Sequence, residues 1–320
     1  MPIAFFALDF DPLLRLGDRA IDLETLVLAL GILGAIILAV RIARRTPVGD
    51  ATQAGLAAGN LRPDDLLFLV LAAVPGAIVG GRLGYGLLHL DYYAVHPGAL
   101  LDPSQGSAQL SLAILGGALT GGLAARLLGE PVGRWFHVAA VPLLVAIAVG
   151  KLAMALGGSG QGLPSGLPWA TSYLGAGPWG SLAPELPSHP AQLYEATATV
   201  IVLAAAIGLL ARGKFARRDG RLFLAALGGW AVARTVVAAT WRDAPVLGPL
   251  LADQLLSIAI AVACIAIHLS APAERAMLDA RIADVRRRVR RPPSGDSPRG
   301  SIVRSPGGEA SGSDELRGQG

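Results

Sequence analysis

Hydrophobic positions along this chain form long continuous runs rather than short alternating patterns. A membrane core about 30 Å thick needs roughly 20 apolar residues in an α-helix, and the chain holds about seven stretches of that length. Short polar segments rich in Gly, Pro and Arg separate these stretches. The pattern therefore predicts an all-α polytopic membrane protein with transmembrane helices near residues 22–41, 65–89, 108–128, 135–157, 190–211, 222–241 and 249–270.

Positive charge falls on alternate connecting segments. Arg and Lys residues follow the first, third and fifth predicted spans, whereas the segments 91–108 and 158–188 contain neither. Cytoplasmic loops of membrane proteins carry an excess of Lys and Arg. We therefore expect the N-terminus to lie outside and the C-terminus in the cytoplasm.

Composition excludes a soluble globular protein. Hydrophobic residues make up 53% of the 320 residues, charged residues make up 16%, and the mean hydropathy is +0.54.

We expect residues 1–274 to form the transmembrane domain and residues 275–320 to form a cytoplasmic tail, basic at first and then Gly/Ser-rich and disordered. The net charge of +4 comes largely from loops and tail, so it does not indicate nucleic-acid binding. Cys264 has no second cysteine to pair with, which excludes a disulfide or a cysteine-based metal site.

Ionisable residues inside the predicted spans share one depth. At about 1.5 Å per residue, Arg82, Lys151, Glu195, Arg234 and Asp253 all lie within a few turns of the outer helix ends. A charge in the membrane costs several kcal/mol unless it is paired or faces water. Three cations against two carboxylates leave a positive excess, which suits an anion such as a phospholipid headgroup. Structural ion pairing, for example of Glu195 with Arg234, is the alternative explanation.

The segment SHPAQLYEA brackets the start of the fifth span. Pro190 suits the first turn of a helix, which makes His189 the expected N-cap and Gln192 the third helical residue. His189, Gln192 and Glu195 are spaced by three, so their side chains lie along one stripe of the helix. We expect this stripe to face a polar cavity, although a purely solvated capping role for His189 remains open.

Glycines recur at helix-packing spacing in two spans: Gly76, Gly80 and Gly84 in the second, Gly117 and Gly121 in the third. Such spacing predicts a close approach of these two helices.

Residues 158–188 are rich in Gly and Pro and contain Trp169, Tyr173 and Trp179. This segment is too polar to span a membrane. We expect an interfacial cap or lid over the site, with an unstructured linker as the alternative.

Several motifs together resemble those of the bacterial prolipoprotein diacylglyceryl transferases. HPAQLYEA resembles the family segment H-P-x-Q-L-Y-E, and GGRLGYGLL resembles G-x-R-x-G-Y. ILGGALTGG, Arg234 and DQLLS align, in family order, with H-G-G-L-x-G, with the arginine of the penultimate span and with G-Q-x-L-S. The resemblance covers roughly residues 20–270.

The resemblance implies transfer of a diacylglyceryl group from phosphatidylglycerol to the lipobox cysteine of a prelipoprotein, the first step of lipoprotein maturation. It implies a multi-pass protein of the bacterial plasma (inner) membrane, with its site on the extracytoplasmic side. Phosphatidylglycerol and prelipoprotein signal peptides would be its partners, and no cofactor or metal is expected.

The resemblance also suggests site residues. His189, Glu195 and Arg234 are expected to be catalytic. Arg234 would hold the phosphate together with Lys151, and His189 or Glu195 would orient groups or accept a proton. Arg82 is expected to bind substrate but is equally suited to a structural role. The remaining residues expected to bind substrate are Tyr85, Gln192, Tyr194 and Gln254.

The chain departs from the family pattern at several polar positions. The family signature G-R-x-G-N-F-x-N-x-E-x-x-G appears here as GKLAMALGGSGQG. The altered positions are Lys151 for arginine, Met154 and Gly157 for asparagine, Ser159 for glutamate, Leu115 for histidine, Ala238 for an acid, and Glu24 or Thr25 for a tyrosine. An active, divergent transferase is the favoured interpretation. The alternatives are a catalytically lapsed homologue that binds phospholipid or lipoproteins, and a transporter or unrelated lipid enzyme.

Overall fold

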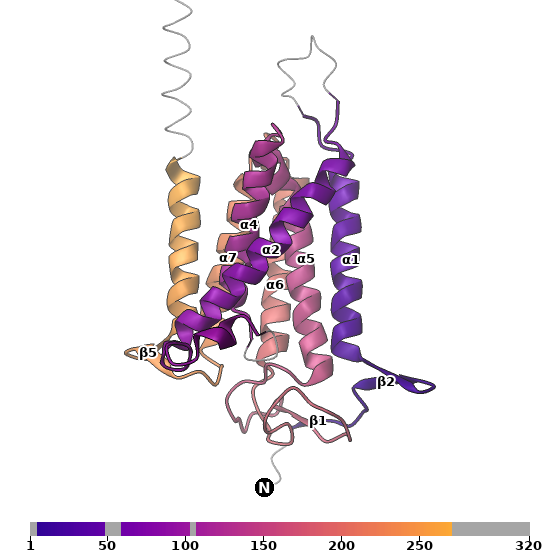
Figure 1. Ribbon diagram of the computed structural model, residues 1–320, viewed down its shortest axis with the longest axis vertical. Helices are drawn as coiled ribbons and strands as arrows, with labels where there is room; N and C mark the ends of the chain where they lie inside the picture. The colour runs from indigo at the N-terminus through magenta and orange to yellow at the C-terminus, as the bar shows by residue number, and fades with distance from the viewer. Residues whose placement is uncertain (1–4, 49–58, 103–106, 271–320) are drawn as a thin grey trace, which may run out of the picture. The chain divides into compact units, whose positions relative to one another are not determined.

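The computed structural model of this chain describes residues 5–48, 59–102 and 107–270. Seven helices in this part are long and apolar enough to cross a membrane, and their ends differ from the predicted spans by at most three residues. The prediction of a mostly helical, polytopic membrane protein is confirmed. The helices are α1 (Leu23–Ala43), α2 (Pro63–Leu88), α4 (Leu110–Leu127), α5 (Val132–Gly157), α6 (Ala191–Ala211), α7 (Arg221–Ala238) and a last helix, Ala252–Ser270 (Figure 1).

Residues Met1–Ala271 form one compact unit. The predicted tail, residues 275–320, lies outside the described residues.

Helix ends follow local chemistry. α1 begins after Asp22, whose carboxylate accepts a hydrogen bond from Glu24 N at 3.0 Å. α2 begins at Pro63, which has no N–H to leave unsatisfied in the first turn. α5 ends at Gly158, whose φ of 74° lies in the left-handed region that glycine adopts readily.

Six short strands in the described part of the chain lie at one end of the bundle, which we call the strand end (Figure 1). β1 (Phe6–Leu8) pairs in parallel with β4 (Thr171–Tyr173). β2 (Leu13–Leu16) and β3 (Arg19–Asp22) form an antiparallel hairpin, and β5 (Pro245–Leu247) pairs with β6 (Leu250–Leu251). The short helices α3 (Leu90–Tyr93) and η2 (Pro97–Leu100) follow α2 at the same end.

The long helices pack in two groups. α2 lies along α4, whereas α1 lies along α5, which also contacts α6 and α7. Contacts between α1 and α2 are few. Away from the strand end, Ala39 of α1, Leu69 of α2, Ala125 of α4 and Trp135 of α5 share one hydrophobic cluster that joins the two groups. Figure 1 shows α2 crossing the bundle obliquely in front of α5.

Glycines bring α2 and α4 into direct backbone contact, as their spacing predicted. A Cβ on Gly76 would collide with Gly116 O and the Thr120 side chain, and one on Gly80 would collide with Leu112 O. Larger residues would therefore force the helices apart.

Candidate functional site

Charged side chains from four helices meet near the strand end. Glu195 of α6 lies between two cations: its Oε2 is 2.9 Å from Lys151 Nζ on α5, and its Oε1 is 2.5 Å from Arg234 Nη1 on α7. Arg234 Nη2 lies 3.2 Å from Asp253 Oδ1 on the last helix. We call Lys151, Glu195, Arg234 and Asp253 the ion cluster. Glu195 is 1% exposed and Arg234 is 4% exposed, so each charge depends on its partners for stabilisation.

Gln109 and Trp241 complete the surroundings of the ion cluster. Gln109 Nε2 donates to Asp253 Oδ1 at 2.6 Å, while Gln109 Oε1 accepts from Leu112 N at 2.6 Å. The Trp241 ring centroid lies 4.4 Å from Arg234 Cζ and 5.9 Å from Lys151 Nζ. These cation–π contacts hold both cations against an apolar surface that excludes water.

Arg82 does not join the ion cluster. Its guanidinium donates to four backbone carbonyls of the segment after α2, those of Ala99, Leu100, Asp102 and Ser107. These contacts favour the structural role for Arg82. The ion cluster therefore holds two cations and two carboxylates, and the predicted positive excess is wrong for these four residues.

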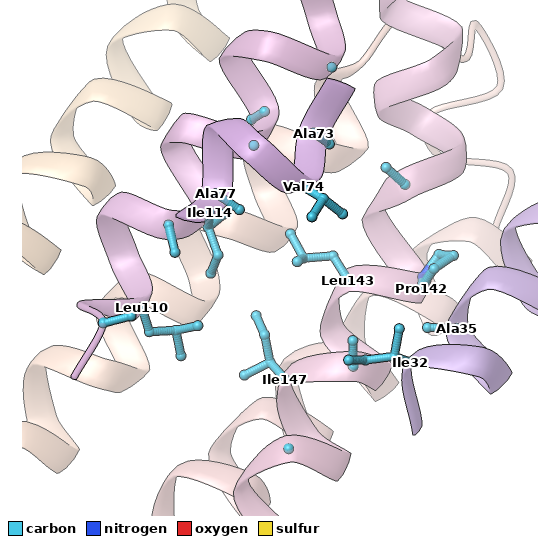
Figure 2. Close-up of a pocket in the computed structure, with 18 of the residues that line it drawn as sticks. Ile32, Ala35, Ala73, Val74, Ala77, Leu110, Ile114, Pro142, Leu143 and Ile147 are labelled. Atoms are coloured by element: carbon cyan, nitrogen blue, oxygen red, sulfur yellow. The ribbon is translucent and has the colours of Figure 1, made fainter. Parts of the chain in front are cut away.

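A cavity of about 930 Å³ extends from the ion cluster into the bundle. Residues of α1, α2, α4 and α5 line it, and Figure 2 shows Ile32, Val74, Ile114 and Leu143 around it. Its lining along α1 runs from Glu24 to Ala39, a rise of about 22 Å. Most of the lining is apolar, so the cavity suits a molecule with a long hydrocarbon part.

Lys151 and Arg234 both line this cavity. Arg234 Nε is buried and has no hydrogen-bond partner within the described residues. A buried donor without a partner costs about 1 to 3 kcal/mol. Because Lys151 and Arg234 both line the cavity, the two cations form the natural anchor for the polar end of an amphiphile.

Glu24 also lines the cavity, and two departures from the family signature accommodate it. Ser159 Oγ donates to Glu24 Oε2 at 2.7 Å. A Cβ on Gly157 would collide with the Glu24 carboxylate. Small residues at these two positions thus admit and bind an acid from α1.

The HPAQLYE segment starts its helix one residue later than predicted. α6 begins at Ala191, and Pro190 is the N-cap, with ψ of 64° outside the helical range. The prediction of His189 as N-cap is therefore wrong, because Pro190 precedes the helix instead of opening it.

The other polar residues of this segment bind the loop 158–188. His189 Nδ1 is 3.4 Å from Tyr194 Oη, which accepts a hydrogen bond from Trp169 Nε1 at 2.7 Å. Gln192 Nε2 donates to Tyr173 Oη at 3.0 Å. None of His189, Gln192 and Tyr194 is among the described residues that line the cavity.

Gln254 joins the last helix to α7. Its Oε1 accepts from Leu251 N at 2.9 Å, and its Nε2 donates to Thr235 O at 3.1 Å.

The structure thus brings together three of the expected site residues, Lys151, Glu195 and Arg234, and places Tyr85 on the cavity wall. The functional roles of all nine expected residues stay predictions. The motifs do not include the other polar residues at the cavity or the ion cluster, which are Glu24, His89, Ser107, Gln109, Trp241 and Asp243. The pairing of Gln109 with Asp253 joins residues 144 positions apart, for which the sequence holds no local signal.

Residues 158–188 fold over the strand end of α5 and α6. Tyr173 of β4 donates to Ala155 O of α5 at 2.8 Å, and burial raises the pKa of Tyr173 to about 12. Arg242 donates to Gly162 O at 2.6 Å and to Ser188 Oγ at 2.9 Å. The segment is ordered by these contacts, and its action as a lid stays a prediction.

Among the described residues, no group of three or more His, Cys, Asp or Glu side chains is placed to hold a metal ion.

Comparison with known proteins identifies the family. The profile of the prolipoprotein diacylglyceryl transferase family matches residues 12–270. The chain is 29% identical over 266 residues to a protein of Trichormus variabilis, covering 81% of this chain and 88% of that protein. It is 30% identical to a protein of Nitrobacter winogradskyi, covering 82% and 87%, and 30% identical to one of Brucella anthropi, covering 72% and 78%. All three relatives are named phosphatidylglycerol–prolipoprotein diacylglyceryl transferase. The resemblance found in the motifs is confirmed, and the chain belongs to the prolipoprotein diacylglyceryl transferase family.

Proposed function

We propose that this protein transfers the diacylglyceryl group of phosphatidylglycerol to the lipobox cysteine of a prelipoprotein. Family membership and the names of the relatives support the reaction. The observation that carries it to this chain is the pair Lys151 and Arg234 at one end of a long apolar cavity. A diacyl lipid with an anionic headgroup has this distribution of polarity.

Phosphatidylglycerol would lie with its acyl chains along α1, α2, α4 and α5 and its phosphate against Lys151 and Arg234. Arg234 supplies a buried guanidinium, and Lys151 supplies a point charge. Glu195 faces a cation with each carboxylate oxygen, so it positions Lys151 and Arg234 and is poorly suited to accept a proton.

In the reaction, the cysteine thiolate attacks the glycerol carbon that carries the phosphate. A C–S bond forms, the C–O bond to the phosphate breaks, and the electron pair leaves with glycerol phosphate. Fixed cations beside the departing phosphate stabilise its growing charge in a site shielded from water.

The strand end would face the outside of the bacterial plasma membrane. Arg and Lys are concentrated at the opposite end of the bundle, at Arg41, Arg44, Arg45, Arg126, Arg134, Arg212, Lys214, Arg217, Arg218 and Arg221. This distribution supports a cytoplasmic location for that end. The loop 158–188 would then cover the site from outside, and both substrates would enter laterally from the membrane.

The family match favours the transferase over a homologue that only binds phospholipid or lipoproteins. The separating experiment incubates purified protein and a lipobox peptide with phosphatidylglycerol, phosphatidylethanolamine or phosphatidic acid. We expect a diacylglyceryl mass on the cysteine with phosphatidylglycerol. Binding of phosphatidylglycerol without any peptide modification would support the binding protein instead.

A further inference from the structure

His89 lies on the cavity wall, where its ring contacts Tyr85. It directly follows Leu88, the last residue of α2, and lines the cavity together with Lys151 and Arg234. His89 Nδ1 is 2.9 Å from Tyr85 O. A carbonyl oxygen only accepts hydrogen bonds, so Nδ1 carries the proton in this contact, and Nε2 of the neutral ring keeps a free lone pair.

The ring of His89 is held in place. It stacks on Tyr85 with centroids 4.1 Å apart and an interplanar angle of 25°, and Tyr85 in turn contacts Tyr93 edge-to-face at 6.2 Å. A fixed ring with a defined tautomer is the arrangement that proton transfer requires.

Among the described residues, two of the three carboxylates that line the cavity are already engaged: Asp253 binds Arg234 and Gln109, and Glu24 accepts from Ser159. Glu195 is not part of the lining and faces Lys151 and Arg234. Asp243 is the third carboxylate of the lining, and the test below includes it as the competing base. All five histidines of the chain lie in described segments, and among them only His89 lines the cavity.

We propose that His89 is the general base that takes the proton from the acceptor thiol. This inference rests on the proposed function. The S–H proton moves to His89 Nε2, and the thiolate forms the C–S bond as the C–O bond to phosphate breaks. The imidazolium then returns its proton to the departing glycerol phosphate or to water, so the ring is neutral for the next cycle.

The charged and titratable groups around His89 come from several elements. They are Tyr85 of α2, Tyr93 of α3, Asp243 before β5, and, on the cavity wall, Glu24, Lys151, Arg234 and Asp253. The His89 and His96 variants below leave all of them unchanged.

The test compares His89→Asn and His89→Gln with His96→Asn. Asn places an amide N–H where Nδ1–H stands, so the bond to Tyr85 O is retained while the free acceptor nitrogen is lost. His96 is a matched control: its Nδ1 is 3.3 Å from Tyr92 O and its ring stacks on Tyr92 at 4.8 Å, but His96 does not line the cavity. Peptide lipidation is measured from pH 6 to 9.5, with phosphatidylglycerol binding and thermal unfolding as checks on folding.

We expect His89→Asn to transfer about 100-fold more slowly than wild type at pH 7 and to bind phosphatidylglycerol normally. Because a free thiol ionises near pH 8.5, the deficit should shrink at least about tenfold by pH 9.5. His96→Asn should stay within about twofold of wild type, and if His89→Asn does not fold, His89→Gln carries the same expectations.

A deficit that is equal at every pH, or a rate within about threefold of wild type at pH 7, would overturn the assignment of His89. The same pH-dependent deficit in Glu24→Gln or Asp243→Asn, with His89→Asn active, would identify that carboxylate as the base instead. If wild type forms no product at all, the proposed function itself fails. If wild type is active and only the expectations for His89 fail, the protein is a transferase whose general base is not His89.

Discussion

Lys151 occupies the position at which the family signature has an arginine. Its ammonium contacts Glu195 at 2.9 Å and faces Trp241, where it acts as a compact point charge rather than a two-pronged donor. The ion cluster therefore keeps two cations at the cavity, but only Arg234 can donate two parallel hydrogen bonds to one anion.

Substitution of Lys151 tests its proposed contact with phosphate. Lys151→Ala removes a charge-assisted contact worth about 1.5 to 3 kcal/mol, so we expect transfer to fall roughly ten- to a hundredfold. Lys151→Arg keeps the charge and should retain activity. The matched control is Lys214→Ala, since Lys214 lies in the loop between α6 and α7, at the other end of the bundle. Unchanged lipid binding and transfer in a folded Lys151→Ala protein would make Lys151 a structural charge.

Residues at the site could be predicted only where a local signal existed. Lys151, Glu195 and Arg234 stand out because a charge inside an apolar run requires a partner. Arg82 carried the same signal but binds carbonyls of the following segment, and a count of charges along the chain cannot distinguish these two uses. Glu24 and Gln109 lie near helix starts, where polar residues are common, and only the packed bundle shows that they reach the site.

Among the elements, α2 and α4 depend most directly on small residues at their contact. Gly80→Ala would place a Cβ against Leu112 O, and overpacking of this kind costs about 1 to 3 kcal/mol. We expect a lower midpoint of thermal unfolding in detergent. Gly34→Ala on α1 is the control, because a Cβ there meets nothing within 4 Å. Equal midpoints for the two variants would contradict the tight packing of α2 on α4.

The loop 158–188 should lose stability at alkaline pH through Tyr173. The pKa of Tyr173 is raised from 10.0 to about 12, so below pH 10 the phenol is protonated in both the folded and the unfolded protein. Between pH 10 and 12 the unfolded protein loses this proton first, and the free energy of unfolding should fall by about 2 to 3 kcal/mol. Unfolding of wild type and Tyr173→Phe across this range measures the difference. If the free energy of unfolding declines equally in both proteins, Tyr173 is not the cause of the decline.

The elements themselves were largely predictable, since a run of about 20 apolar residues has few alternatives to a membrane helix. The exact residue at which each helix begins was harder to predict. Proline is compatible with both the N-cap and the first helical position, so Pro190 left the start of α6 open by one residue. The conformation of the loop 158–188 depends on the pairing of β4 with β1, which lies more than 160 residues earlier in the chain. No local sequence pattern predicts that pairing.

For the whole molecule, sidedness follows from the distribution of positive charge. Single cysteines introduced on a Cys264→Ser background should react from outside at positions in 91–102 and 158–188. Positions in 212–221 should react only after permeabilisation. Labelling of the 212–221 loop from outside would reverse the orientation and move the ion cluster to the cytoplasmic side.

The central claim is that the ion cluster holds the phosphate of phosphatidylglycerol while its diacylglyceryl group moves to a thiol. The most direct measurement follows glycerol phosphate release and peptide lipidation in parallel, for wild type and Arg234→Lys. We predict one glycerol phosphate per modified cysteine in wild type. Both products should fall together, at least about tenfold, in Arg234→Lys, because lysine cannot reproduce the contacts of the buried guanidinium. Release of glycerol phosphate without peptide modification, or equal rates in the two proteins, would contradict this account.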